Sequence, residues 1–277
     1  MIILVTGSKG QLGHDVVVAL KERNIEYIAA DRDEFDITNE LEVQEFIIKH
    51  KPDAVIHCAA YTAVDLAEDE VELCYKVNED GTKYIASACK KIDAKMIYIS
   101  TDYVFGGNDE GFYKPQDKTN PISAYGRSKL AGEEVATSIL EKLFIVRISW
   151  VFGKNGNNFV KTMLRLAEDR SELNVVADQI GSPTYTVDLA GLLCDMVLTE
   201  KYGVYHATNE GTCSWAEFAE EIFRQSRLGA KVNPIPARDY PTKAVRPYNS
   251  VMDKTCLGEN GFRRLSNWKD ALKRYLE

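Results

Sequence analysis

The feature that most constrains this chain is a glycine triplet, Gly7, Gly10 and Gly13, directly after the apolar run at residues 2–5. A short β-branched run of this kind predicts a buried parallel strand. Apolar residues at 12, 16, 17 and 20 predict a following helix, whose free N–H groups would face a bound phosphate. Strand, glycine turn and helix in this order predict a dinucleotide site, although the spacing is G-x-x-G-x-x-G rather than G-x-G-x-x-G.

The composition is typical of a soluble globular protein, with 277 residues, 45% hydrophobic and 27% charged. This length suffices for one large α/β domain or two smaller ones. The net charge of -8 argues against a general nucleic-acid-binding surface. No stretch approaches the roughly 18 apolar residues of a membrane span, and no charged-then-apolar leader precedes the first strand. We therefore expect a cytoplasmic protein with neither nucleic acid nor membrane as a partner.

The cysteines and histidines lack the spacings of metal ligands. The six cysteines contain no C-x-x-C pair, and the four histidines show neither H-x-x-x-H nor H-x-H. We expect buried free thiols rather than disulfides or zinc ligands, and we predict no metal site.

Strands and helices alternate through the first half of the chain. The expected strands cover residues 2–6, 27–30, 54–58, 96–100 and 144–150, with helices between them. The helix before the third strand is expected to start near Thr38 and Asn39 and to stop at residues 51–53. Repeated β-α units predict an α/β fold with a Rossmann-type, doubly wound parallel sheet and ligands at the C-terminal strand ends.

After residue 150 the pattern loosens. We expect helices over 160–167 and 186–198, a late strand over 204–207, and an irregular, proline-rich segment over 233–247. Ser214 and Glu217 have the form of a capping box that opens a helix to about residue 226. The prediction is a dinucleotide-binding domain over 1–150, to which the chain returns around 185–210, and a smaller lobe over 151–277.

An acidic residue, Asp31, ends the second strand about 20 residues past the glycine turn, where a carboxylate accepts hydrogen bonds from an adenosine ribose. It favours NAD over NADP, because a 2′-phosphate would face this carboxylate. Arg32 and Lys9 are able to neutralise such a phosphate, so use of both NADH and NADPH stays open. Asp36 and Ile37 form a polar-apolar pair suited to holding the adenine.

Two further strand ends and one helix start complete the predicted site. The third strand ends in residues 57–62, where small residues such as Ala59 and Ala60 let a ligand lie against the backbone. Tyr125 and Lys129 lie at i and i+4 in a helix expected from about Ser123, so they share one face. A phenol with an ordinary pKa near 10 transfers protons near pH 7 only if an ammonium or an oxidised nicotinamide stabilises its phenolate. A hydroxyl from Ser100 or Thr101 would fix the substrate oxygen.

These motifs resemble the extended short-chain dehydrogenase/reductase superfamily and, within it, the dTDP-4-dehydrorhamnose reductase family. The matching stretches are residues 7–13, 59–65, 100–105, 125–129, 149–151, 157–165, 178–184 and 246–247. The resemblance implies NAD(P)H-dependent reduction of the C4 ketone of dTDP-4-dehydro-β-L-rhamnose to dTDP-β-L-rhamnose, for surface polysaccharide. The smaller lobe would then bind mainly the substrate, and a homodimer is the candidate assembly.

The resemblance also implies roles for single residues. Tyr125 would protonate the C4 oxygen, Lys129 would lower the pKa of Tyr125 and hold the nicotinamide ribose, and Thr101 would bind the reacting oxygen. The motifs and the resemblance together predict one set of cofactor contacts: Gly7, Gly10, Gln11, Leu12, Gly13, Asp31, Asp36, Ile37, Ala59, Ala60, Tyr61, Thr62, Ser100, Tyr125 and Lys129. The predicted substrate contacts are Thr101, Asp102, Tyr103, Trp150, Asn158 and Arg246.

Three alternatives stay open. A nucleotide-sugar 4,6-dehydratase needs a further acid/base pair, usually Asp-Glu after the threonine, whereas here Tyr103 follows Asp102. A C4 epimerase would keep its cofactor bound and show no net redox change. A non-catalytic regulatory subunit, like the β subunit of methionine adenosyltransferase, is the third, and the intact Tyr125, Lys129 and Thr101 argue against it.

Overall fold

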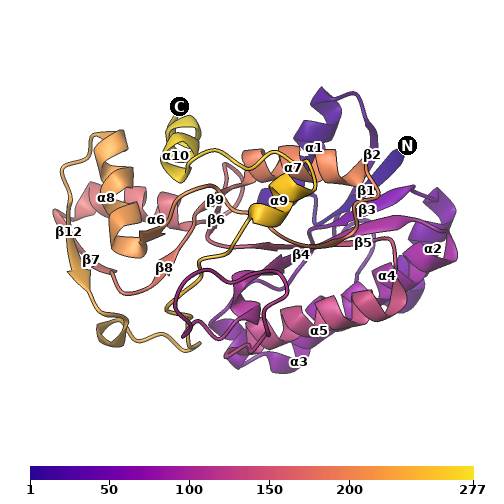
Figure 1. Ribbon diagram of the computed structural model, residues 1–277, viewed down its shortest axis with the longest axis horizontal. Coiled ribbons are helices and arrows are strands. Elements are labelled where there is room, and N and C mark those ends of the chain that lie inside the picture. Colours follow the sequence, from indigo (N-terminus) through magenta and orange to yellow (C-terminus); the bar gives the residue numbers. More distant parts are fainter.

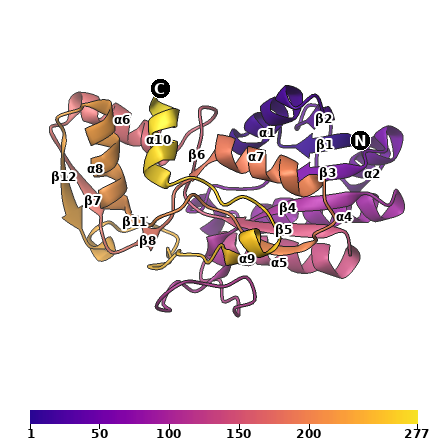
Figure 2. The ribbon, with the colours of Figure 1, turned by 45° about the horizontal axis from the view of Figure 1, so that its top comes forward.

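The centre of the protein is a six-stranded parallel sheet (Figures 1 and 2, right half). The computed structural model describes residues 1–277. The strands are β1 (Ile2–Thr6), β2 (Glu26–Ala30), β3 (Ala54–His57), β4 (Lys95–Thr101), β5 (Leu143–Ile148) and β10 (Gly203–His206), in the order β10-β5-β4-β3-β1-β2. The connections change direction between β1 and β3, so ligands are expected beyond the C-terminal ends of these strands. The predicted doubly wound α/β class is confirmed.

Helices cover both faces of this sheet (Figure 1). Helices α1 (Gln11–Glu22) and α7 (Thr186–Val197) pack on one face. Helices α2 (Glu40–His50), α4 (Gly81–Lys91) and α5 (Ala124–Ile139) pack on the other. Along β4 the side chains alternate between the two cores: Ile97 and Ile99 face α1 and α7, and Met96 and Tyr98 face the other layer. Burial on both faces explains why these strands are almost wholly apolar.

The second lobe lies beyond one end of the sheet and has its own core (Figure 2, left). Its aromatic side chains pack between three helices and a two-stranded parallel ribbon. The helices are α6 (Phe159–Asp169), α8 (Trp215–Ser226) and α10 (Trp268–Leu276), and the ribbon pairs β7 (Glu172–Val176) with β12 (Lys231–Ile235). The short α-helices and strands are α3 (Val71–Tyr75), α9 (Thr255–Glu259), β6 (Val151–Phe152), β8 (Ile180–Gly181), β9 (Thr184–Tyr185) and β11 (Cys213–Ser214). Four further short helical turns are η1 (Leu66–Glu68), η2 (Lys76–Asp80), η3 (Asp102–Val104) and η4 (Ala237–Asp239).

Most predicted element boundaries hold to within two residues. Asn39 caps α2, and Lys51 ends it in the left-handed conformation. The capping box of Ser214 and Glu217 is present and α8 ends at Ser226. None of the helices combines the length and hydropathy needed to cross a bilayer.

Two predictions of local structure are wrong. The strand expected to reach residue 150 stops at Ile148, because Trp150 adopts a left-handed conformation with φ 49°. The segment expected to be irregular begins with β12, where residues 231–235 pair with β7. Pro234 removes one N–H donor, which this two-stranded edge tolerates.

Candidate active site

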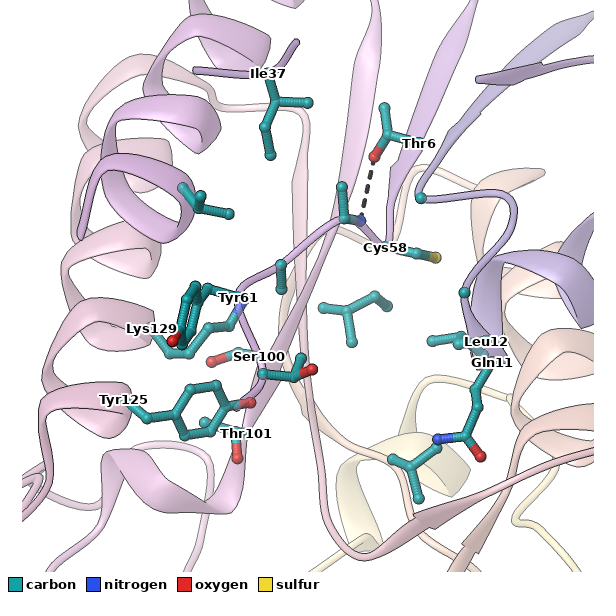
Figure 3. Close-up of a pocket in the computed structure, with 18 of the residues that line it drawn as sticks. Thr6, Gln11, Leu12, Ile37, Cys58, Tyr61, Ser100, Thr101, Tyr125 and Lys129 are labelled. Carbon is teal, nitrogen blue, oxygen red and sulfur yellow. Dashed lines mark hydrogen bonds between the residues drawn. The ribbon is translucent and has the colours of Figure 1, made fainter. Parts of the chain in front are cut away.

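A cavity of about 840 Å³ opens at the C-terminal ends of β1, β3 and β4. All predicted site residues line it except Gly13, Asn158 and Arg246. Figure 3 shows Tyr125 and Lys129 on one side of this cavity, with Gln11 and Leu12 on the other. The fold therefore brings together residues that are more than 100 positions apart in the sequence.

The glycine turn is shaped by close packing. Gly7 has φ 64°, and a Cβ atom there would lie 2.7 Å from the backbone nitrogen of Ala59. A Cβ atom on Gly13 would overlap the carbonyl oxygen of Gly7, so Gly13 lets α1 pack against the turn and does not line the cavity. Only glycine satisfies both contacts.

Most N–H groups of the turn are already used. Ser8 N donates to the Ala30 carbonyl (3.1 Å), and Gly10 N donates to the Gly7 carbonyl (2.9 Å). The backbone N–H groups of Gln11, Leu12 and Gly13, in the first turn of α1, have no partner in the protein. These free donors at a helix N-terminus are suited to a diphosphate.

Asp31 follows the last residue of β2 and lines the cavity. Its carboxylate accepts hydrogen bonds from the backbone N–H groups of Lys9 and Arg32, both at 2.9 Å. The ammonium of Lys9 pairs with Asp33 at the surface. Asp36 accepts hydrogen bonds from Thr38 through Oδ1 (2.8 and 2.9 Å), and the backbone hydrogen bond is the main cause that lowers the pKa of Asp36.

Helix α5 carries Tyr125 and Lys129, which both line the cavity. Ser123 caps this helix, and its Oγ accepts from Gly126 N (3.1 Å). Lys129 is 2% exposed. Burial lowers the pKa of Lys129 to about 7, and the charge of Glu133, one turn further along α5, opposes this.

Burial raises the pKa of Tyr125 above its ordinary value, and Thr101 opposes the rise. Burial outweighs every influence that would lower this pKa, because a buried phenolate loses its hydration. The effect of Lys129 on Tyr125 stays a prediction.

The two hydroxyl residues at the end of β4 differ in their hydrogen bonds. Thr101 Oγ1 donates to Asp102 Oδ1 (2.9 Å) and accepts from Tyr103 N (3.2 Å). Ser100 Oγ is buried, lines the cavity and has no partner. Burial raises the pKa of Asp102 to about 6. Ser100 thus has a free proton for a ligand, whereas Thr101 gives its proton to Asp102.

A second cavity of about 200 Å³ adjoins the first and is lined almost entirely by aromatic and apolar side chains. Its lining is Tyr103, Trp150, Val151, Phe152, Phe159, Trp215, Phe218 and Arg246. The Trp150 ring stacks on Trp215 with a centroid distance of 3.6 Å and an interplanar angle of 12°. Trp150 therefore borders both cavities.

Arg246 and Asn158, predicted as substrate contacts, have different surroundings. Arg246 borders the second cavity and donates to Asp65 Oδ2 (2.5 Å) and to the Tyr103 hydroxyl (3.1 Å). Asn158 borders neither cavity. It caps α6, and its amide donates to the Gly153 carbonyl (2.8 Å) and to Gln11 Oε1 (3.0 Å). The structure therefore places Asn158 in the framework of the site.

Comparison with known proteins identifies the family. The family model described as RmlD substrate binding domain matches residues 1–277. The chain belongs to this family, that of the dTDP-4-dehydrorhamnose reductases. It is 44% identical to the dTDP-4-dehydrorhamnose reductase of Aggregatibacter actinomycetemcomitans, over 98% of this chain and 97% of that protein.

Solved structures agree with this assignment. The RfbD orthologue of Clostridium acetobutylicum has a TM-score of 0.98 and 43% identity, over 100% of this chain and 98% of that one. The dTDP-4-dehydrorhamnose reductase of Bacillus anthracis, solved in complex with NADP, has a TM-score of 0.97 and 42% identity, over 99% and 98%. The resemblance predicted from the motifs is confirmed.

Sequence reasoning missed several residues of this RmlD-family site. Trp215, Phe159 and Phe218 line the second cavity, yet each reads in the sequence as an ordinary apolar residue of an amphipathic helix. Asp65 lay in a matching stretch, but nothing in the sequence indicated its bond to Arg246, 181 residues away. No local signal would have found either feature.

Proposed function

We propose that the protein catalyses NADH- or NADPH-dependent reduction of the C4 ketone of dTDP-4-dehydro-β-L-rhamnose, giving dTDP-β-L-rhamnose. The observation that carries this proposal is one cavity in which the glycine turn, Tyr125, Lys129 and the strand-end hydroxyls meet. Membership of the reductase family supports the substrate. The NADP complex of the Bacillus anthracis relative supports the cofactor class.

The residues present fit a dinucleotide. Its diphosphate would lie at the free N–H groups of Gln11 and Leu12, and its adenosine ribose near Asp31. Ile37 would border the adenine, and Ala60 and Tyr61 the middle of the molecule. The reduced nicotinamide supplies the hydride.

Proton transfer falls to Tyr125. Its raised pKa keeps the phenol protonated at neutral pH, which is the form that donates a proton to the C4 oxygen. The free hydroxyl of Ser100 would donate a hydrogen bond to the same oxygen. Thr101 gives its proton to Asp102, so in this proposal Ser100 and not Thr101 donates to the substrate oxygen. Lys129 would hold the nicotinamide ribose and stabilise the phenolate once the proton has left.

The second lobe would bind the sugar nucleotide. Trp150 borders both cavities, and Arg246 offers a guanidinium suited to a diphosphate. We infer that residues 151–277 serve mainly the substrate, apart from α7 and β10, which return to the sheet around residues 186–206.

The test is oxidation of NADH and NADPH by purified protein with dTDP-4-dehydro-L-rhamnose, beside the matching UDP- and GDP-linked keto sugars. We expect rapid oxidation with the dTDP ketone alone, and light scattering of the same preparation tests for a homodimer. Dinucleotide binding without oxidation by any ketone would contradict the reductase and favour an epimerase or a regulatory subunit. Failure to bind either dinucleotide would contradict the cofactor assignment as well.

A further inference from the structure

The loop at residues 153–158, called here the clasp loop, connects the second lobe to the glycine turn. Asn155 Nδ2 donates hydrogen bonds to the Lys9 carbonyl (2.6 Å) and to the Gly10 carbonyl (3.3 Å). These two carbonyls immediately precede the first turn of α1. Asn155 itself does not line the main cavity, so it acts on the turn from the outside.

The geometry of the peptide bond gives this contact a consequence inside the cavity. In a trans peptide, the carbonyl of one residue and the N–H of the next point in opposite directions. The Gly10 carbonyl also accepts from His14 N of α1 (3.1 Å), so α1 and Asn155 hold it together. Because no cis peptide is present, a carbonyl held in this way turns the Gln11 N–H in the opposite direction. The Gln11 N–H is one of the free donors of the cavity, and Gln11 lines it.

The clasp loop is itself held in place. Lys161 Nζ donates to the carbonyls of Lys154 and Gly156, both at 2.7 Å. Asn158 donates to the Gly153 carbonyl and to Gln11 Oε1. Gly156 has φ 72°, and a Cβ atom there would lie 3.0 Å from Gln11 Cγ. The loop therefore presents Asn155 from a fixed backbone rather than from a mobile one.

We propose that Asn155 is a positioning residue for the cofactor diphosphate, supplied by the second lobe. It keeps the carbonyls of Lys9 and Gly10 away from the anion, and so keeps the Gln11 N–H directed at it. The inference deepens the proposed function and rests on it for the identity of the ligand as a dinucleotide. The affinity of the glycine turn for the diphosphate would then depend on Asn155, a residue outside the sheet domain.

The experiment compares Asn155→Ala and the nearly isosteric Asn155→Asp with the wild type. Binding of NADH, NADPH and ADP-ribose is measured by fluorescence or calorimetry, and turnover is measured at saturating cofactor. Loss of one or two hydrogen bonds predicts a Kd about 3- to 20-fold higher for all three ligands with Asn155→Ala. For Asn155→Asp we expect a larger loss that shrinks with added salt, because a carboxylate repels both carbonyls and the diphosphate.

Asn157→Ala is the matched control, since Asn157 is exposed in the same loop and its side chain makes no hydrogen bond. It should leave every Kd within twofold of the wild type. The proposal predicts that kcat at saturating cofactor stays within about twofold in Asn155→Ala while Kd rises, a split that a general loss of folding would not give. Unchanged Kd values in both Asn155 variants, or an equal loss in Asn157→Ala, would overturn it. Absence of dinucleotide binding by the wild type would instead contradict the proposed function.

Discussion

Lys129 places its ammonium 4.1 Å from the centre of the Tyr98 ring. The Tyr98 hydroxyl in turn donates to the Lys129 carbonyl oxygen (3.2 Å), so β4 and α5 hold each other at this point. Gly132 permits the approach, because a Cβ atom there would overlap the Tyr98 hydroxyl. The cation rests on an aromatic face within a buried site, where such contacts are strongest. Packing of β4 against α5 thus sets the orientation of the Lys129 side chain.

Removing the buried ammonium should stabilise the fold. The pKa of Lys129 is about 7 in the folded protein against an ordinary 10.5, so the unfolded chain binds this proton more tightly. Burying the protonated Lys129 therefore lowers the free energy of unfolding. This loss has its full size below pH 7 and becomes smaller as the pH rises from about 7 toward 10.5. We expect Lys129→Met to raise the free energy of unfolding at pH 7 by on the order of 1 kcal/mol or more, while turnover collapses. Urea unfolding at pH 6, 8 and 9.5 should show the advantage shrinking with pH, and exposed Lys83→Met should show no such trend.

Tyr125→Phe removes the proton donor and little else. We expect turnover to fall by roughly 10²–10⁴. The Kd for NADH should stay near normal, because the phenyl ring keeps its edge contact with Tyr103. Steady-state kinetics measure the turnover, and titration with NADH measures the Kd. Unchanged turnover would mean that the proton comes from another group.

Asp31→Ala should weaken NADH binding more than NADPH binding. The carboxylate lines the cavity beside Arg32 and accepts two backbone N–H groups, so it is fixed where a ribose 2′-hydroxyl would meet it. Loss of a charged acceptor costs about 1.5–3 kcal/mol, or roughly 10- to 100-fold in the Kd for NADH. A greater loss for NADPH would reverse this interpretation of the site.

Arg246→Ala should weaken binding of the sugar nucleotide without changing binding of the dinucleotide. Its guanidinium borders the second cavity and not the main one. We expect KM for the keto sugar to rise roughly 10- to 100-fold, with the Kd for NADPH within twofold of the wild type. Arg238→Ala, an exposed change in the same segment, serves as the control. Equal effects on both ligands would show that Arg246 supports the whole cleft instead.

Gly13→Ala should destabilise the protein, because the new methyl group would overlap the Gly7 carbonyl oxygen. Overpacking of this kind costs about 1–3 kcal/mol. Gly229→Ala is the matched control, since a Cβ atom there meets nothing within 4 Å. Thermal unfolding of both variants measures the difference. Equal stability of the two would mean that the turn relaxes without cost.

Local patterns predicted the sheet well because its central strands β1, β3, β4 and β5 are almost wholly buried and read as apolar runs. Two predictions of local structure failed. Trp150 takes a left-handed conformation that its sequence does not indicate, and β12 pairs with β7, a strand about 60 residues away in the sequence. Asn158, predicted as a substrate contact, caps α6, a local role in which asparagine is common. Its contact with the substrate stays a prediction.

The sequence by itself determined the order of strands and helices along the chain, the glycine turn, and the helix face that Tyr125 and Lys129 share. These follow from periodicity and from steric limits that act between near neighbours. Only the tertiary structure decided the protonation of the site, because the pKa values of Tyr125, Lys129 and Asp102 depend on burial. It also decided the contacts of Asn155 and Arg246, which join residues 146 and 181 positions apart. Burial and long-range contact arise when the whole chain packs, and no local stretch of sequence encodes them alone.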